Sequence, residues 1–156
     1  TNYIYSMHLA QEAIQGSDLL MLHGDLVFDT QVLEKLLKTP GNRCCMDETA
    51  PLPPKDFKGR LRDGFLQEVS VDIFDDDCYA LQPMYKLDAA TAGAWSQEVG
   101  AWVSRGQVKV YAEHALNRIT DSLHIRPWSY TGMLLAEVDT PADYRTVWEA
   151  LEACRK

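Results

Sequence analysis

Two acidic positions that lie far apart in the sequence stand where a divalent cation could be bound. Asp25 follows the apolar segment Leu19–Leu22, and Asp139 follows Glu137 just before a helix start at Thr140. The carboxyl ends of strands in open α/β sheets form the crevice where ligands bind, and carboxylate oxygens are the ligands that Mg²⁺ prefers. If the two strands are neighbours, Asp25 and Asp139 can hold one Mg²⁺ from two sides. The structural alternative is that Asp25 turns the chain and Asp139 supports the helix N-terminus.

The segment Leu19–Leu22 is expected to be the strand around which the domain is organised. Its consecutive apolar residues are too few for a helix and are typical of a strand buried on both faces, at the centre of a mostly parallel sheet. Helical patterns before and after this strand complete an α/β arrangement. The sequence therefore predicts one α/β domain over residues 1–156, with a mixed, mostly parallel sheet flanked by helices.

Apolar periodicity, helix caps and turn residues predict the remaining elements. The Asp63-Gly64 pair between alternating apolar residues indicates a β-hairpin, which adds antiparallel strands to the sheet. Side chains able to cap helices occur at Asn2, at Asp29 or Thr30, at Asp88 and at Thr140. The expected helices cover residues 4–15, 30–38, 89–104, 113–119 and the segment after Thr140. The expected strands cover residues 43–47, 65–71, 78–81 and 107–111, and residues 124–138 are expected to be rich in strand.

The composition is that of an ordinary globular protein, with 156 residues, of which 46% are hydrophobic, and a formal net charge of −8. This charge argues against broad binding to nucleic acid or to an anionic membrane, because both need a basic face. No apolar run reaches the ~20 residues that cross a bilayer, and the first residues lack the pattern of a signal peptide, so we expect a cytoplasmic protein. The four cysteines lack metal-ligand spacing and are expected to be reduced thiols: Cys44, Cys45, Cys78 and Cys154.

Three segments, taken in order, resemble a known enzyme family. They are Asn2 with Ser6-Met7 and Ala10, then Leu22-His23-Gly24-Asp25-Leu26-Val27-Phe28, then Glu137-Val138-Asp139-Thr140-Pro141-Ala142-Asp143-Tyr144. This order resembles the nucleotidyltransferases that make nucleotide-activated sugars and alcohols, and it looks most like choline-phosphate and related cytidylyltransferases.

The resemblance implies a Rossmann-like nucleotidyltransferase fold and a magnesium-dependent reaction. In that reaction a phosphate or phosphonate oxygen of the acceptor attacks the α-phosphorus of a nucleoside triphosphate, and pyrophosphate leaves. The resemblance also implies that Asp25 and Asp139 bind the Mg²⁺ and act as the catalytic residues, and that Glu137 joins them. The implied substrates are CTP and a phosphorylated small-molecule acceptor such as phosphocholine or a sugar phosphate.

The family's first strand and its Gly-rich loop, with an arginine and a Pro-Lys pair that grip the nucleotide, have no counterpart in this sequence. Residues Thr1 to Ile14 instead look like a helix that follows that loop. The chain thus resembles the C-terminal two-thirds of such an enzyme without its N-terminal nucleotide-binding strands, and we expect it to be inactive alone. A bared sheet edge invites pairing with another chain, so we also expect a homodimer.

An acceptor with a positively charged head would need aromatic and acidic side chains, which attract cations through cation–π and charge interactions. The candidate side chains are Tyr85, Tyr111, Trp128, Tyr130, Glu113 and Glu137. Core packing is the alternative for most of these rings. A lysine after Pro54, either Lys55 or Lys58, is the candidate for steadying phosphate charge, although solvated surface lysines are common.

Two other functions remain open from the sequence. The missing Gly-rich loop favours a non-catalytic fragment or a binding and assembly module that keeps half of the fold. The acidic run Asp75-Asp76-Asp77 resembles the metal motif of glycosyltransferases, but three acids in a turn are typical of a solvated loop. The four histidines have no ligand spacing, so we predict no zinc site. His23, beside Gly24, either faces the cleft or is structural, and we expect the structural role.

Overall fold

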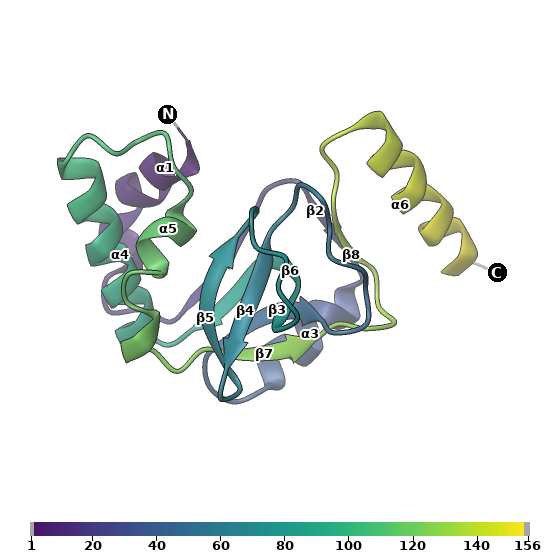
Figure 1. The fold of residues 1–156 in the computed structure, drawn as a ribbon, viewed down its shortest axis with the longest axis horizontal. Coiled ribbons are helices and arrows are strands. Elements are labelled where there is room, and N and C mark those ends of the chain that lie inside the picture. Colours follow the sequence, from purple (N-terminus) through teal and green to yellow (C-terminus); the bar gives the residue numbers. More distant parts are fainter. Residues whose placement is uncertain (1, 155–156) are drawn as a thin grey trace.

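A long strand, β6 (Cys78–Leu87), organises the main sheet in the computed structural model, which describes residues 2–154 (Figure 1). One edge of β6 pairs with β3, and the other pairs first with β4 and then, further along, with β1. β5 continues the sheet beyond β4, and β7 continues it beyond β3. The other strands of this sheet are β1 (Leu19–Leu22), β3 (Arg43–Asp47), β4 (Lys58–Arg62), β5 (Phe65–Ser70) and β7 (Arg126–Ser129).

The prediction of a mixed α/β fold with a sheet flanked by helices is confirmed, but the role predicted for residues 19–22 is wrong. β1 borders the sheet and pairs with β6 alone among the described strands, so its side chains are half-buried or exposed rather than buried on both faces. Within the described sheet, β3 and β7 pair in parallel, whereas the other pairings are antiparallel. The antiparallel pairings are the β4–β5 hairpin and the pairings of β6 with β1, β3 and β4.

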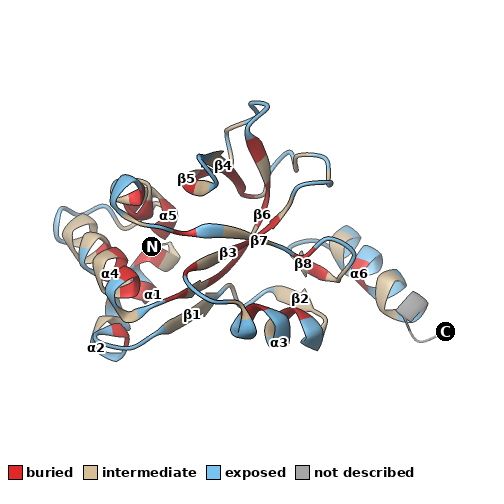
Figure 2. Cartoon of the chain, turned by 90° about the horizontal axis from the view of Figure 1, so that it is seen from below, coloured by how far each residue is buried: buried red, intermediate tan, exposed pale blue. Residues whose placement is uncertain are grey.

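Helices cover both faces of the sheet, and each layer has its own apolar core (Figures 1 and 2). Cys44 packs into the core under one layer and Cys45 into the core under the other, as alternation along a strand requires. Cys44, Cys45 and Cys78 are free, as expected, and the structure also shows them buried; the side chain of Cys154 lies outside the described residues. The helices are α1 (Tyr3–Leu9), α2 (Gln11–Ile14), α3 (Thr30–Lys38), α4 (Ala89–Ser104), α5 (Ala112–Leu116) and α6 (Pro141–Cys154), with a 3₁₀ turn over Thr120–Ser122.

Local signals placed several elements correctly. Asp88 caps α4 by accepting a hydrogen bond from the Thr91 N–H at 2.8 Å. Asp63 (φ 53°) and Gly64 (φ 77°) both adopt positive φ in the β4–β5 turn, which the primed hairpin turns require. These side chains and backbone angles act within a few residues, so the sequence alone predicts them.

Two expected elements differ from the structure because tertiary contacts override local periodicity. The single helix expected over residues 4–15 is interrupted at Ala10, where α1 gives way to α2. The Gln11 side chain then donates a hydrogen bond to the Ser96 carbonyl of α4 at 3.2 Å. Residues 107–111, expected to be a strand, form an irregular connection that leads into α5.

A second, two-stranded sheet lies beside the main one. β2 (Leu26–Phe28) and β8 (Leu135–Glu137) pair antiparallel, with Leu26 opposite Glu137. α6 follows β8 and lies beyond this ribbon in Figure 1. Thr140 and Asp143 cap α6 reciprocally, with the Thr140 N–H donating to Asp143 at 2.8 Å and the Asp143 N–H to Thr140 Oγ1 at 3.3 Å.

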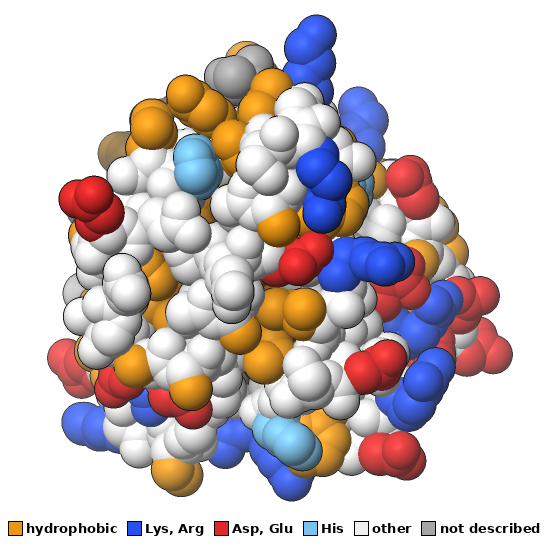
Figure 3. All heavy atoms as spheres, turned by 90° about the vertical axis from the view of Figure 1, so that its left-hand side faces the viewer, with side chains coloured by type: hydrophobic (Ala, Val, Ile, Leu, Met, Phe, Trp, Pro, Cys, Tyr) orange, Lys and Arg blue, Asp and Glu red, His pale blue; other side chains and the backbone are white. Residues whose placement is uncertain are grey.

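The surface differs from one region to the next. On the face shown in Figure 3, acidic and basic side chains are interspersed around the rim, while the middle carries mainly uncharged groups. Within the described part of the chain, no helix combines the length and the apolar character needed to cross a membrane.

Candidate metal and substrate site

The β2–β8 ribbon brings the two predicted cation ligands together. Asp25 lies in the turn between β1 and β2, and its carbonyl accepts a hydrogen bond from the Val138 N–H at 3.0 Å. Asp139 follows directly after Val138, so a residue early in the chain meets one near its end. The sequence predicted that two strand ends would meet, but the structure joins them through an antiparallel ribbon outside the main sheet.

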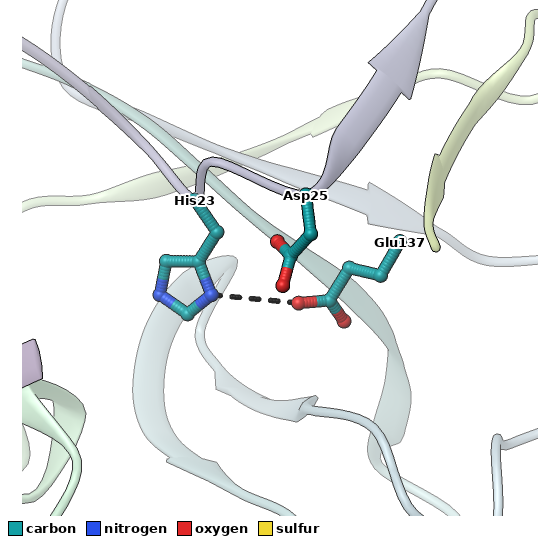
Figure 4. A group of neighbouring side chains, drawn as sticks. All are labelled: His23, Asp25 and Glu137. Atoms are coloured by element: carbon teal, nitrogen blue, oxygen red, sulfur yellow. Dashed lines mark ion pairs between the residues drawn. The ribbon is translucent and has the colours of Figure 1, made fainter. Parts of the chain in front are cut away.

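Three side chains converge at this point: His23, Asp25 and Glu137 (Figure 4). Their candidate ligand atoms all lie within 4.8 Å of one another, and His23 Nδ1 is 3.4 Å from Glu137 Oε1. Burial and the neighbouring Asp25 carboxylate both raise the pKa of Asp139. Carboxylates held this close repel one another, and a cation between them would relieve that repulsion.

These acids line a pocket of about 250 Å³. Four carboxyl groups, those of Asp25, Asp56, Glu137 and Asp139, border it, while its lining contains a single lysine, Lys55. Apart from His23, the pocket lining therefore carries four acidic groups and one basic group, and this negative charge attracts cations.

Aromatic rings form the remaining wall of the pocket. Phe57 meets Tyr111 edge to face with ring centroids 5.0 Å apart, and Tyr3 meets His23 in the same manner at 4.5 Å. Tyr3 and Tyr111 are 6.3 Å apart, which links the two pairs into one set of rings. Rings beside carboxylates are suited to hold a desolvated cationic group.

Tyr85 and Glu113, which we predicted to contact substrate, lie behind this wall and do not line the pocket. Both are fully buried, and the Tyr85 hydroxyl donates a hydrogen bond to Glu113 Oε1 at 3.3 Å. Glu113 Oε2 has no partner among the described residues. Burial raises the pKa of Glu113 to about 8, so this carboxyl is neutral at physiological pH and offers little charge to a bound cation.

Comparisons with known proteins give a consistent result for the fold. Neither a protein-family model nor a curated protein sequence matches the chain. Among solved structures, CTP:phosphocholine cytidylyltransferase from Streptococcus pneumoniae is similar, with 18% identity, a TM-score of 0.73, and coverage of 96% of this chain and 64% of that one. The inositol-1-phosphate CTP transferase from T. maritima has 13% identity, a TM-score of 0.66, and coverage of 92% and 59%. UDP-glucose pyrophosphorylase from Acinetobacter baumanii has 7% identity, a TM-score of 0.62, and coverage of 94% and 54%.

The chain has a nucleotidyltransferase-like fold. It spans between 54% and 64% of the length of these three structures.

Within this nucleotidyltransferase-like fold, two of the aromatic residues predicted to bind substrate lie elsewhere. Tyr130 is buried and Trp128 half-buried in the core that contains Cys45 and Met84, on the opposite face of the sheet from Tyr85. The strand-rich segment places them there because β7 continues the sheet beyond β3. The structure therefore shows both residues in core packing, which was the alternative to substrate contact.

Lys58, one of the two lysines considered for phosphate, is fully buried. Its ammonium group donates hydrogen bonds to the Pro53 carbonyl at 2.9 Å and to the Val71 carbonyl, and it lies 4.1 Å from the centre of the Phe74 ring. Burial lowers the pKa of Lys58. These contacts anchor the loop to the sheet, so Lys55 is the lysine available to a phosphate.

The Asp75–Asp77 run has a structural partner. Arg60 forms ion pairs with Asp75, with Glu68 and, at 3.2 Å, with Asp77. These ion pairs tie the turn to β4 and give Asp75 and Asp77 a structural role, while their use as a glycosyltransferase metal motif stays a prediction.

Sequence reasoning overlooked Tyr3 and Phe57 and placed His23 outside the chemistry. Phe57 follows the proline-rich loop that we expected at the edge of a cleft, and Tyr3 starts the first helix. A lone aromatic residue in such places carries no spacing signal. His23 stands two residues before Asp25, but its partner Glu137 is distant in the sequence, so no spacing rule marked it as a ligand.

Proposed function

We propose that this chain forms the metal and acceptor part of a nucleotidyltransferase that transfers a cytidylyl group from CTP to a phosphorylated amino alcohol such as phosphocholine. The pocket carries the proposal, because its carboxylates suit a divalent cation, its lysine suits a phosphate group and its aromatic wall suits the cationic head of an acceptor. The similarity to CTP:phosphocholine and inositol-phosphate CTP transferases supports the reaction class.

The donor set fits Mg²⁺. Asp25 and Asp139, which lie close together in the pocket, would hold the ion, with Glu137 beside them, because hard carboxylate oxygens suit this cation. A divalent ion held by these residues would supply positive charge that neutralises the substrate phosphates. Burial and, after it, the neighbouring Asp25 carboxylate raise the pKa of Asp139, and a bound cation would favour its charged form.

The reaction needs positioning rather than a strong acid or base. An acceptor phosphate oxygen forms a bond to the α-phosphorus of CTP, and the bond from that phosphorus to the pyrophosphate oxygen breaks, so the leaving group carries away the electron pair. Lys55, on the pocket rim, would steady the phosphate charge that develops.

The aromatic wall would select the head of the acceptor. Tyr111, Phe57 and Tyr3 present ring faces and edges beside the carboxylates, an arrangement that favours a quaternary ammonium group over a neutral sugar. A sugar phosphate remains the second candidate, because UDP-glucose pyrophosphorylase has a similar fold. The two acceptors differ in charge, so binding measurements separate them.

Calorimetric titration in the presence of Mg²⁺ and CTP tests the acceptor. We expect phosphocholine to bind more tightly than glucose 1-phosphate, and Tyr111→Leu to weaken phosphocholine binding about tenfold, because the variant loses a cation–π contact. Tyr144→Leu, at an exposed position on α6, is the matched control. Equal binding of both acceptors, unaffected by Tyr111→Leu, would contradict the amino-alcohol assignment.

Lys55→Gln is expected to weaken CTP binding several-fold while leaving the free energy of unfolding unchanged. Lys55 is exposed at the pocket, so its loss removes phosphate attraction and little packing. Lys38→Gln, an exposed lysine on α3, controls for the change in net charge. If both variants bind CTP as the unaltered chain does, Lys55 has no role in phosphate binding.

The remaining expectations stay predictions. They are that the chain needs a Gly-rich loop from another segment to release pyrophosphate, that it forms a homodimer, and that it is cytoplasmic. Pyrophosphate release from this chain, measured alone and together with a segment that carries the family's Gly-rich loop, tests the first of them. A non-catalytic module would release none in either case.

A further inference from the structure

The backbone and the ring of His23 both contact neighbouring elements beside the acidic groups. Its backbone N–H donates a hydrogen bond to the Pro83 carbonyl of β6 at 3.2 Å, which fixes the chain at the end of β1. Its ring packs edge to face against Tyr3, with centroids 4.5 Å apart, and against Phe57 at 6.1 Å. The imidazole is therefore packed against two rings beside the acidic groups, with 16% of the side chain exposed.

The two ring nitrogens have different surroundings. Nε2 is buried and has no hydrogen-bond partner among the described residues. Nδ1 faces the acids and is 3.4 Å from Glu137 Oε1, as Figure 4 shows. The polar function of this histidine is therefore directed, through Nδ1, at Asp25 and Glu137.

We propose that His23 Nδ1 is a ligand of the divalent cation and that the site consequently prefers first-row transition ions such as Mn²⁺ and Co²⁺ to Mg²⁺. This inference rests on the cation site of the proposed function. Mg²⁺ is bound through oxygen, whereas imidazole nitrogen suits transition ions. The site becomes one nitrogen and two carboxylates, from His23, Asp25 and Glu137, with Asp139 next to it.

The spacing of the three groups agrees with this role. Ligand atoms that share an ion at about 2.1 Å each lie at most about 4.2 Å apart. The three candidate atoms lie within 4.8 Å of one another, so small side-chain rotations bring them onto one ion. An ion pair between His23 and Glu137 alone would leave the nearby Asp25 carboxylate without a partner of opposite charge.

The experiment is a titration of the full chain with Mn²⁺, followed by electron paramagnetic resonance, with Mg²⁺ as competitor. We expect Mn²⁺ to bind at least about tenfold more tightly than Mg²⁺. Electron spin-echo modulation of the bound Mn²⁺ should contain a directly coordinated ¹⁴N signal. His23→Phe keeps a ring against Tyr3 and Phe57 but removes the nitrogen, so the ¹⁴N signal and the preference for Mn²⁺ should both disappear. His124→Phe, at an exposed histidine beside Phe65, is the matched control.

The outcomes separate this inference from the function on which it rests. If Mn²⁺ binds without a ¹⁴N signal and Asp25→Asn abolishes this binding, His23 is not a ligand and the carboxylate site is supported. No Mn²⁺ binding at all overturns both. A ¹⁴N signal that His23→Phe abolishes, in a chain that binds neither CTP nor phosphocholine, supports the ligand and overturns the proposed reaction.

Discussion

Replacing Asp25 with asparagine is expected to abolish pyrophosphate release and to weaken divalent-cation binding on the order of 100-fold. Asp25 is close to every other candidate ligand. Its carboxylate lies within ligand distance of His23 and Glu137, and its charge also raises the pKa of Asp139. Asparagine keeps the size and one oxygen but removes the charge. Calorimetric titration with Mg²⁺ measures the loss of affinity. Turnover is measured as released pyrophosphate, in the presence of the segment that carries the Gly-rich loop.

A control for this variant must lose a charge without losing a ligand. Asp76→Asn serves, because Asp76 is exposed in the acidic turn and lies outside the ion pairs that Arg60 forms with its neighbours. Near-ultraviolet circular dichroism should be unchanged in both variants, because both positions are exposed. Undiminished Mg²⁺ affinity in Asp25→Asn would remove the basis of the cation site.

Features encoded within a few residues were predictable from the sequence. The cap at Asp88, the turn at Asp63-Gly64 and the reciprocal cap of Thr140 and Asp143 all act within four residues of the chain. The alternation of Cys44 and Cys45 across a strand is equally local. Each of these follows from backbone geometry that does not depend on the rest of the fold.

Features set by distant partners were not predictable in the same way. An apolar tetrapeptide such as β1 fits the centre or the border of a sheet, and the pairing of β6 decides which. The same holds for aromatic residues: Tyr111 lines the pocket, while Trp128 packs into a core, although both are isolated rings in the sequence. Core packing and ligand contact use the same residue types.

The meeting of residues 25 and 139 is an intermediate case. The sequence indicated that both follow strands, and the order of motifs indicated one shared site, but neither gave the antiparallel ribbon that joins them. His23 shows the limit of spacing rules, because its partner Glu137 is more than a hundred positions away. A ligand set drawn from both ends of a chain has no local pattern.

The buried Glu113, behind the pocket, is expected to make the free energy of unfolding depend strongly on pH. The pKa of Glu113 is about 8 in the folded chain, against an ordinary value of 4.5, because the carboxyl is fully buried. Below the lower value, both folded and unfolded chains carry the proton. Between the two values the unfolded chain releases it while the folded chain keeps it, so rising pH favours unfolding by up to about 1.4 kcal/mol per pH unit.

Glu113→Gln is neutral in both states and should remove this dependence. We expect the variant and the unaltered chain to have similar free energies of unfolding near the lower pKa. The variant should be the more stable by several kcal/mol, as an order of magnitude, above the upper one. Glutamine retains an oxygen that can accept the hydrogen bond from the Tyr85 hydroxyl, so packing is largely preserved. Urea unfolding across this pH range measures the difference, and Glu34→Gln, at an exposed position on α3, controls for the loss of an ordinary carboxylate. Parallel pH profiles for Glu113→Gln and the unaltered chain would mean that Glu113 is ionised in the fold, and that the acidic pocket in front of it tolerates a further negative charge.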